Sequence, residues 1–197
     1  MTEEEPSVTK SDLRKSLRAA RRAHVEALPD SMRTLMFMRP PAPLMDMIPE
    51  GAAIGFYRAG SYEAPTASYA RSFFEQGRTL ALPRFAHEDA PMEFARFTAP
   101  FNESDLEEGP FGILQPEADA PAMQPQVLFV PLVGCTAQGA RLGQGGGHYD
   151  RWLTEHPGTV AIGLAWDCQL VDHLPTEPHD ARLTAVVTPT RIYGPFA

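Results

Sequence analysis

The stretch RLGQGGGHYDRWL (141–153) crowds four glycines into five positions, directly before the reactive run His-Tyr-Asp-Arg. Glycine lacks a Cβ, so such a loop lets a ligand approach the main chain closely, at a cost in conformational entropy. The apolar run QVLFVPLV (126–133) precedes it and predicts a strand, and HYDRWLTEH (148–156) predicts a helix that Pro157 ends. The order strand, glycine-rich turn, helix favours an anion site, because free N–H groups and the helix dipole meet there.

The loop differs from the two common phosphate motifs. A Walker A loop needs a lysine directly after its last glycine, and none follows here. The dinucleotide fingerprint G-x-G-x-x-G, started at Gly143, would need a glycine where His148 stands. The sequence therefore predicts a phosphate cradle of another kind, with Asp150 beside it. The alternative is a tight turn without a ligand, but plain turns need one or two glycines rather than four.

Strands and helices alternate along the rest of the chain. Strands are predicted at 52–59, 78–85, 92–98, 126–133, 159–166 and 182–189, and helices at 11–28, 63–77 and 148–156. This pattern predicts a three-layer, Rossmann-like α/β fold, a mostly parallel open sheet with helices on both faces. Ligands bind beyond the carboxyl ends of such strands, so the turn YRAGSYEAP (57–65) is expected on the same edge as the glycine-rich loop. The length favours one domain spanning 1–197, with residues 1–8 expected to be flexible.

The net charge of −8 is unevenly distributed. Between residues 10 and 24, six basic residues stand against Asp12 alone, a local charge of +5, so the rest of the chain carries −13. Such an acidic chain is not expected to bind nucleic acid. An anionic ligand would need the local positive field of this basic segment.

The predicted first helix has an apolar stripe and a basic face. The apolar stripe, at a spacing of three to four residues, is predicted at Leu13, Leu17, Ala20, His24 and Leu28. Thr9 or Ser11 suits the N-cap, and Lys10, Arg14 and Arg18 recur on one face. A basic face of this kind is usually solvated. The predicted anion loop favours instead a role for it beside a polyphosphate.

Membrane and secreted classes are not favoured by the sequence. No run approaches the ~20 apolar residues of a membrane span, and the acidic start MTEEEPSVTK is unlike a signal peptide. Cys135 and Cys168 form neither a disulfide framework nor a zinc pattern. We therefore expect a soluble cytoplasmic protein, a monomer without a membrane partner.

The loop and the weaker motifs around it resemble the 5-formyltetrahydrofolate cyclo-ligase family, also called methenyltetrahydrofolate synthetases. That family usually shows R-L-G-[RQ]-G-x-G-Y-Y-D, which RLGQGGGHYD (141–150) closely follows. The further similar elements are Lys10 and Arg14 in the first helix, Glu63 after the first strand, LPRF (82–85), GPFGILQP (109–116) and LPTEPHD (174–180). The chain differs in three places: Gln144 where Arg is common, His148 where Tyr is common, and Gln115 where Glu is frequent.

The resemblance implies an enzyme that uses ATP and Mg²⁺ to convert 5-formyltetrahydrofolate to 5,10-methenyltetrahydrofolate, with release of ADP and phosphate. It implies catalytic roles for Lys10, Arg14 and Tyr149. The implied ATP-binding residues are Lys10, Arg14, Arg141, Leu142, Gly143, Gln144, Gly145, Gly146, Gly147, His148 and Tyr149. The implied substrate-binding residues are Arg58, Glu63, Gln144, Gly145, Gly146, Gly147 and His148. The implied Mg²⁺ ligands are Asp150 and Asp180, and the candidates for stacking on the pterin ring are Tyr149, Phe56 and Phe111.

Two other functions fit parts of the pattern. A sugar-phosphate isomerase or CoA transferase on a similar scaffold would explain the anion loop but not the basic first helix. A non-catalytic chain that keeps the nucleotide or folate pocket would tolerate the changes at Gln144 and His148. Of these, only the enzyme implied by the resemblance would form 5,10-methenyltetrahydrofolate from 5-formyltetrahydrofolate and ATP.

Overall fold

An eight-stranded sheet organises the computed structural model, which describes residues 9–196; the predicted flexibility of residues 1–8 lies outside that range. Its strands are β1 (Ile54–Gly55), β2 (Leu80–Arg84), β3 (Glu93–Phe97), β6 (Ala122–Met123), β7 (Val127–Val130), β10 (Val160–Leu164), β11 (Ala185–Val187) and β12 (Ile192–Tyr193). Their order is β12-β11-β10-β7-β1-β2-β3-β6. The five strands from β11 to β2 are parallel, whereas β12 pairs antiparallel with β11, β3 with β2, and β6 with β3. The prediction of a mostly parallel open sheet is confirmed.

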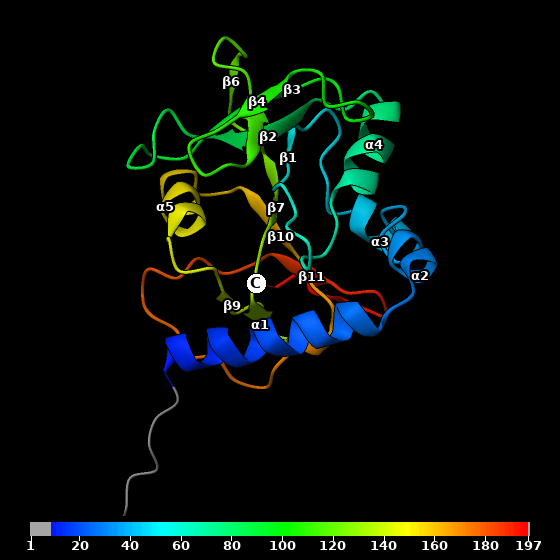
Figure 1. The fold of residues 1–197 in the computed structure, drawn as a ribbon, viewed down its shortest axis with the longest axis vertical. Helices are drawn as coiled ribbons and strands as arrows, with labels where there is room; N and C mark the ends of the chain where they lie inside the picture. Colours follow the sequence, from blue (N-terminus) through cyan, green and yellow to red (C-terminus); the bar gives the residue numbers. More distant parts are fainter. Residues whose placement is uncertain (1–8, 197) are drawn as a thin grey trace, which may run out of the picture.

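Helices cover both faces of this sheet (Figure 1). The helices are α1 (Lys10–Ala27), α2 (Asp30–Leu35), α3 (Ala42–Met45), α4 (Ala67–Glu75), α5 (His148–Glu155) and the short 3-10 helix η1 (Asp167–Gln169). Two small hairpins complete the fold, β4 (Leu106–Glu108) with β5 (Leu114–Pro116), and β8 (Gly134–Cys135) with β9 (Arg141–Leu142). In Figure 1, α4 and α5 lie on opposite sides of the sheet, and α1 runs across its lower end.

The strands bury side chains on both faces, which explains their nearly continuous apolar character. Along β7, Val127 and Phe129 join the cluster that contains Phe73 of α4. The alternate residues Leu128 and Val130 join the second cluster, which contains Trp152 of α5. The alternation in β7 thus assigns one side chain in two to each helical layer, as the pleat requires.

Several predicted elements are shorter in the structure, and prolines explain two of the boundaries. Helix α4 begins at Ala67 rather than 63, because Pro65 disfavours the helical conformation at the residue before it. Strand β7 ends before Pro131, which has no N–H to donate to the ladder. The strand predicted at 52–59 pairs only over β1, so most of its second half belongs to the loop that carries Glu63.

Helix α1 begins as predicted, and most of its predicted apolar stripe faces the protein. Thr9 is its N-cap and forms a capping box with Asp12. Of the predicted stripe, Leu17 is buried and Leu13, His24 and Leu28 are half-buried, whereas Ala20 is exposed. Arg21 and Val25 are also buried, so the inward face is partly polar.

The chain leaves the neighbouring parallel strands β1 and β7 in opposite directions. β1 continues through α4 to β2, whereas β7 continues through α5 to β10 on the other side. A crevice forms at the carboxyl ends of two strands whose connections diverge in this way. The loop after β1 and the glycine-rich loop after β7 therefore meet at one edge, as the sequence predicted.

Gly55 is required by this packing, and replacing it tests the fold. A Cβ at Gly55 would lie 2.8 Å from Leu128 Cδ1 and 3.1 Å from Phe94 Cε1. We expect Gly55→Ala to lower the free energy of unfolding by about 1–3 kcal/mol, as other overpacked cores do. Urea denaturation measures it. Gly60→Ala is the matched control, because its Cβ would have an ordinary 3.6 Å contact; equal stability of the two variants would contradict the packing argument.

Candidate functional site

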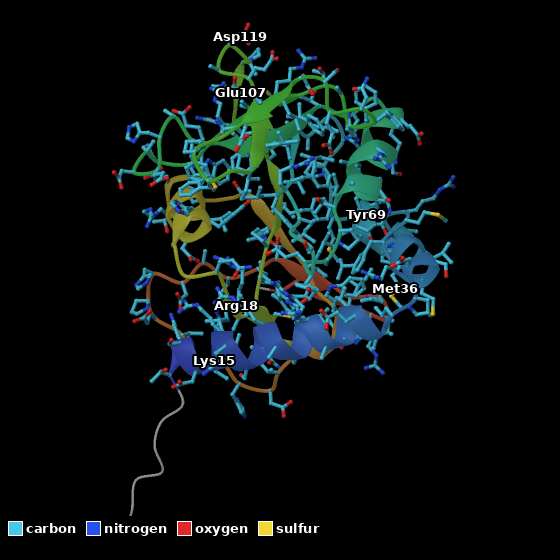
Figure 2. The ribbon with its side chains drawn as sticks, viewed as in Figure 1. Lys15, Arg18, Met36, Tyr69, Glu107 and Asp119 are labelled. Atoms are coloured by element: carbon cyan, nitrogen blue, oxygen red, sulfur yellow. The ribbon has the colours of Figure 1, made fainter. Side chains whose placement is uncertain are left out.

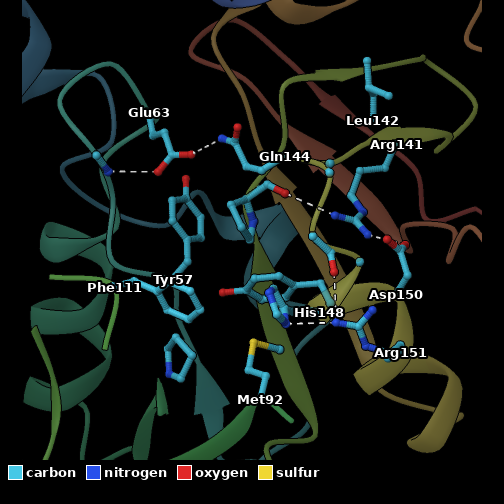
Figure 3. A pocket seen from close by; sticks show the side chains of 18 of the residues that line it. Tyr57, Glu63, Met92, Phe111, Arg141, Leu142, Gln144, His148, Asp150 and Arg151 are labelled. Carbon is cyan, nitrogen blue, oxygen red and sulfur yellow. Dashed lines mark hydrogen bonds and ion pairs between the residues drawn. The ribbon is translucent and has the colours of Figure 1, made fainter. Parts of the chain in front are cut away.

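A cavity of about 1210 Å³ opens at this crevice. The segments that line it include one side of α1, the loop after β1, the region between β2 and β3, the β4–β5 hairpin, the glycine-rich loop with α5, and residues 177–180. Figure 3 shows side chains from several of these segments converging on the same space. Every residue that the resemblance implied for catalysis, ATP, substrate or metal binding, from Lys10 to Asp180, lines this cavity.

The glycine-rich loop needs its glycines for conformation and for space. Gly145 and Gly147 have φ values of +116° and +65°, in the region that favours glycine, and Gly147 is the N-cap of α5. A Cβ at Gly146 would lie 2.8 Å from the His148 ring. The first N–H groups of α5 have no partner within the helix, so the loop directs backbone donors and the helix dipole at the cavity.

The basic face of α1 holds this loop in place. Arg14 Nε donates to Gly143 O at 2.9 Å, and Arg18 Nη2 donates to Gln144 O at 2.9 Å. Arg18 points toward the body of the protein while Lys15 lies on the outer side of the same helix (Figure 2). The alternative of a wholly solvated basic face is therefore wrong: one side of α1 is docked against the loop.

Lys10 pairs with two acids of residues 177–180 at the cavity. Its Nζ lies 2.6 Å from both Asp180 Oδ2 and Glu177 Oε2. Burial alone would lower the pKa of Lys10, but the hydrogen bonds and charges of Asp180 and Glu177 outweigh the effect of burial. The pKa of Lys10 is therefore raised. The pKa of Asp180 is lowered, because the bonds from Lys10 and from the Glu177 N–H outweigh its partial burial. Lys10 and Asp180 are thus both charged at neutral pH.

Asp150 is held by a buried arginine. Arg141 Nη2 donates to Asp150 Oδ1, which also accepts the Ala181 N–H at 3.1 Å. The Arg141 side chain is only 2% exposed, and its Nε is buried without a hydrogen-bond partner among the described residues. Because Ala181 directly follows Asp180, this bond brings the two predicted metal ligands to the same part of the cavity.

The two carboxylates are compatible with Mg²⁺ in the presence of phosphate. Mg²⁺ is usually held by one or two carboxylates together with substrate phosphates. Asp150 and Asp180 each use one oxygen for a basic side chain and a backbone N–H, and both line the cavity beside the glycine-rich loop. Glu177, His179 and Asp180 bring one potential ligand atom each within 4.8 Å of one another, but Lys10 binds two of the three.

An apolar and aromatic wall lines the side of the cavity near the β4–β5 hairpin. The His148 ring lies 5.0 Å from the Phe85 ring and 6.2 Å from that of Phe111, which is 46% exposed (Figure 3). His148 Nδ1 lies 3.0 Å from Arg151 Nη2, and arginine only donates, so the nitrogen accepts. Burial and Arg151 lower the pKa of His148, so its ring is neutral at pH 7.

The three aromatic candidates for stacking have different places. Phe111 and Tyr149 line the cavity. Phe56 does not: it is buried in the core and stacks on Phe129 at 4.8 Å, so that suggestion was wrong. A strand alternates its side chains, and Phe56 falls on the face toward α4 rather than toward the cavity.

Tyr149 can act only as a hydrogen-bond donor or a packing surface at neutral pH. Burial, followed by the charge of Glu63, raises its pKa well above the ordinary value for tyrosine. Tyr57 is buried beside it, and its hydroxyl donates to Ala64 O at 2.6 Å. Leu142 packs against Leu17 and Val133, so any contact of Leu142 with a ligand comes from its main chain.

The loop after β1 presents one arginine and one acid. Arg58 forms a two-bond pair with Glu103, whose pKa it lowers. Glu63 Oε2 accepts the Gly60 N–H at 2.9 Å, and Glu63 Oε1 lies 3.7 Å from Arg21 Nη1. The Arg21 side chain is only 9% exposed.

Among the residues of the cavity wall that sequence reasoning did not assign to the site are Arg21, Phe85 and Arg151. Arg21 lies three residues after Arg18, within the spacing of one helix face, which is the signal that could have found it. Phe85 follows the end of β2 and Arg151 lies one turn into α5, and both positions depend on how the strands are ordered.

The fold and cavity define an α/β protein with a glycine-rich loop beside a cavity at the switch point of a mostly parallel sheet. A model of the 5-formyltetrahydrofolate cyclo-ligase family matches residues 6–189, so the chain belongs to that family. This confirms the resemblance seen in the glycine-rich loop.

Individual relatives agree with this assignment. The chain is 42% identical to the 5-formyltetrahydrofolate cyclo-ligase of Escherichia coli over 97 residues, which cover 46% of this chain and 53% of that protein, about half its length. It is 31% identical to the Haemophilus influenzae protein of the same name over 136 residues, covering 66% and 72%. The NMR structure of 5,10-methenyltetrahydrofolate synthetase from Aquifex aeolicus shares the fold, with a TM-score of 0.74, 22% identity, and coverage of 94% of this chain and 92% of that one.

The buried Arg141 tests how far the site supports the fold. We expect Arg141→Gln to lower the free energy of unfolding by about 1–3 kcal/mol, because the Asp150 carboxylate and Pro131 O lose their donors. Thermal and urea denaturation measure the change. Arg151→Gln is the control, since Arg151 is exposed, and it should cost less than about 0.5 kcal/mol. If Arg151→Gln were more destabilised than Arg141→Gln, the pair of Arg141 and Asp150 would add no stability.

Proposed function

We propose that this protein converts 5-formyltetrahydrofolate to 5,10-methenyltetrahydrofolate at the expense of ATP, with Mg²⁺ bound alongside. The observation that carries the proposal is one cavity with two chemically different ends. At one end, basic residues of α1 and the backbone of residues 143–147 offer a place for phosphates. At the other, an aromatic wall and the Glu63 carboxylate suit a flat heterocycle that carries N–H donors.

The residues divide between these two ends. The proposed ATP-binding residues are Lys10, Arg14, Arg141, the backbone of Leu142, Gly143, Gln144, Gly145, Gly146 and Gly147, and His148 and Tyr149. The proposed substrate-binding residues are Arg58, Glu63, His148 and the loop from Gln144 to Gly147. The glycine-rich loop is proposed for both sets because its backbone lies at the phosphate end while its Gln144 side chain contacts Glu63 at the other end.

The reaction makes a leaving group from an unreactive amide oxygen. The formyl oxygen attacks the γ-phosphorus of ATP, the bond to the β-phosphate oxygen breaks, and ADP leaves. N10 then adds to the activated carbon and loses its proton, and cleavage of the formyl C–O bond releases phosphate and gives the 5,10-methenyl ring. Lys10 and Arg14 offset charge on the transferred phosphoryl group, where fixed cations are most effective. Tyr149, protonated at neutral pH, donates a hydrogen bond beside them.

Asp150 and Asp180 would hold Mg²⁺, which would neutralise charge on the phosphates when bound. No described helix is long and apolar enough to span a bilayer. We further propose that the protein acts as a cytoplasmic monomer without nucleic-acid partners. Its two free cysteines and its acidic composition support this proposal.

A direct assay tests the function against its alternatives. The protein is mixed with 5-formyltetrahydrofolate and Mg-ATP, and the absorbance of 5,10-methenyltetrahydrofolate is followed. Growth of that absorbance, dependent on both ATP and protein, is the expected result. A folate- or nucleotide-binding protein without turnover would bind but show no growth, and an isomerase or CoA transferase would show neither.

Asp150→Asn is expected to lower kcat by 100-fold or more, about 2.7 kcal/mol in the transition state. The amide keeps the shape of the carboxylate and can still accept from Arg141 and Ala181, but it removes the charge that would hold Mg²⁺. Steady-state kinetics over a range of Mg²⁺ concentrations make the measurement. Asp119→Asn, on the exposed surface (Figure 2), is the matched control. A near-normal kcat with unchanged Mg²⁺ dependence would remove Asp150 from the metal site.

Arg14→Ala is expected to raise the KM for ATP at least tenfold and to change the KM for 5-formyltetrahydrofolate less. The substitution removes both a cation and the bond to Gly143 O that holds the loop. Lys15→Ala on the exposed side of the same helix is the control, and it should leave both constants within about twofold. Equal effects of Arg14→Ala and Lys15→Ala would show that α1 acts only through its overall charge.

A further inference from the structure

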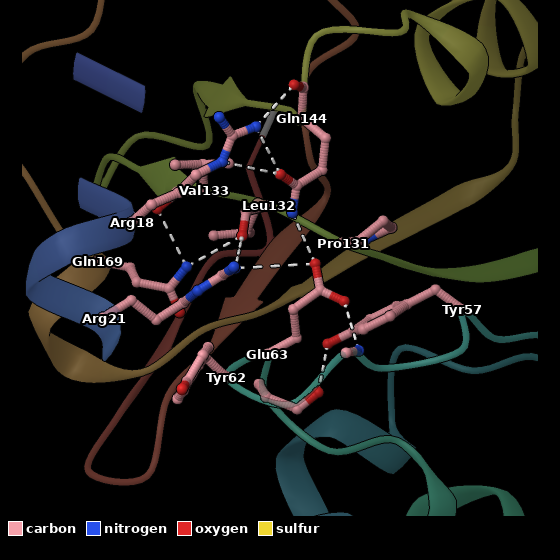
Figure 4. A network of polar contacts seen from close by, with 12 residues as sticks. Arg18, Arg21, Tyr57, Tyr62, Glu63, Pro131, Leu132, Val133, Gln144 and Gln169 are labelled. Carbon is pink, nitrogen blue, oxygen red and sulfur yellow. Dashed lines mark hydrogen bonds and ion pairs between the residues drawn. The ribbon is translucent and has the colours of Figure 1, made fainter. Parts of the chain in front are cut away.

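Gln144 uses both ends of its side-chain amide on protein partners. Its Oε1 accepts from Arg18 Nη2 at 2.8 Å, and its Nε2 donates to Glu63 Oε1 at 2.7 Å. Figure 4 shows the chain of contacts from Arg18 through Gln144 to Glu63, with Arg21 beside it. A side chain so engaged has little left to offer a ligand directly.

The direction of the amide follows from the chemistry of its neighbours. A guanidinium only donates hydrogen bonds, and a carboxylate only accepts them. Arg18 therefore requires Gln144 Oε1 on its side, and Glu63 requires Nε2 on the other. The two charged groups fix the same orientation, so the amide links a cation of α1 to the acid of the loop after β1.

We propose that Gln144 is a positioning residue for Glu63, and that Arg18 acts on Glu63 through it. Glu63 Oε2 is held by the Gly60 N–H of its own turn, and Oε1 is held from across the cavity by Gln144. A carboxylate with one bond on each oxygen keeps further acceptor sites for a paired donor edge of a heterocycle. This inference rests on the proposed function, in which Glu63 receives the pterin ring.

The arrangement also couples the two ends of the cavity. Arg14 and Arg18 both bind the glycine-rich loop, one at Gly143 and one at Gln144. The segment that offers backbone donors to phosphates is thus the segment whose side chain orients the acid for the folate. Placement of the loop and placement of Glu63 are set together.

The test replaces Gln144 and Arg18 singly and together. Gln144→Met keeps the length and the neutral charge of the side chain but removes its hydrogen bonds to Arg18 and Glu63. We expect the KM for 5-formyltetrahydrofolate to rise about fivefold to tenfold, which is the effect of losing one exposed charge-assisted hydrogen bond. The KM for ATP should change less than about twofold, because the backbone contact of Arg18 with residue 144 remains. Gln144→Glu, which still accepts from Arg18 but repels Glu63, should raise the folate KM further. Lys15→Met is the control.

The double substitution distinguishes action through Gln144 from independent action. Arg18→Met should raise the folate KM in the native background and have no further effect on it in Gln144→Met. Additive effects, or a folate KM that Gln144→Glu leaves unchanged, would overturn the proposal. If the wild-type protein shows no turnover, the proposed function fails instead. In that case the contact between Gln144 and Glu63 is tested by the melting temperatures of Gln144→Met, Glu63→Gln and the double variant. Non-additive shifts in melting temperature support the positioning contact, and additive shifts overturn it.

Discussion

The docking of α1 on the glycine-rich loop is the constraint on which the site depends. A loop of four glycines has almost no side chains with which to hold its own conformation, and its backbone entropy opposes order. Arg14 and Arg18 supply what the loop lacks, by donating to Gly143 O and Gln144 O. The positive field of the chain's most basic segment is thereby fixed beside the glycine-rich loop that lines the cavity.

The sheet makes that docking useful. Because β1 and β7 are parallel neighbours whose connections diverge, the loop carrying Glu63 and the glycine-rich loop end at the same crevice. The acids and cations there are matched: Lys10 with Asp180, Arg141 with Asp150, and Arg21 with Glu63. Each of these three acids thus has an opposite charge that holds it in position, which organises the cavity before a ligand arrives.

Sequence patterns predicted the fold class and the location of the candidate site, because the signals for both lie in residues that are close together in the sequence. Alternating periodicities identify strands and helices, and four glycines next to a helix start indicate a ligand loop. Arg21, Phe85 and the bond between Gln144 and Glu63 could not be found this way, since they depend on which strands are neighbours and on the side of α1 that faces inward. Phe56 shows the same limit: whether an aromatic side chain enters the core or the cavity is decided by the pleat of β1 within the assembled sheet.

Two arginines show that this region is not arranged for stability alone. Nε of Arg21 and Nε of Arg141 are buried without hydrogen-bond partners among the described residues, although most buried polar groups in proteins are paired. Both side chains lie in the wall of the cavity, one beside Glu63 and one beside Asp150. An unsatisfied buried donor costs stability that a fold without a function would have no reason to retain. For Arg21 and Arg141 the cost falls beside the two acids that the proposed reaction uses, one for the heterocycle and one for the metal, which supports a role for both guanidinium groups at the proposed site.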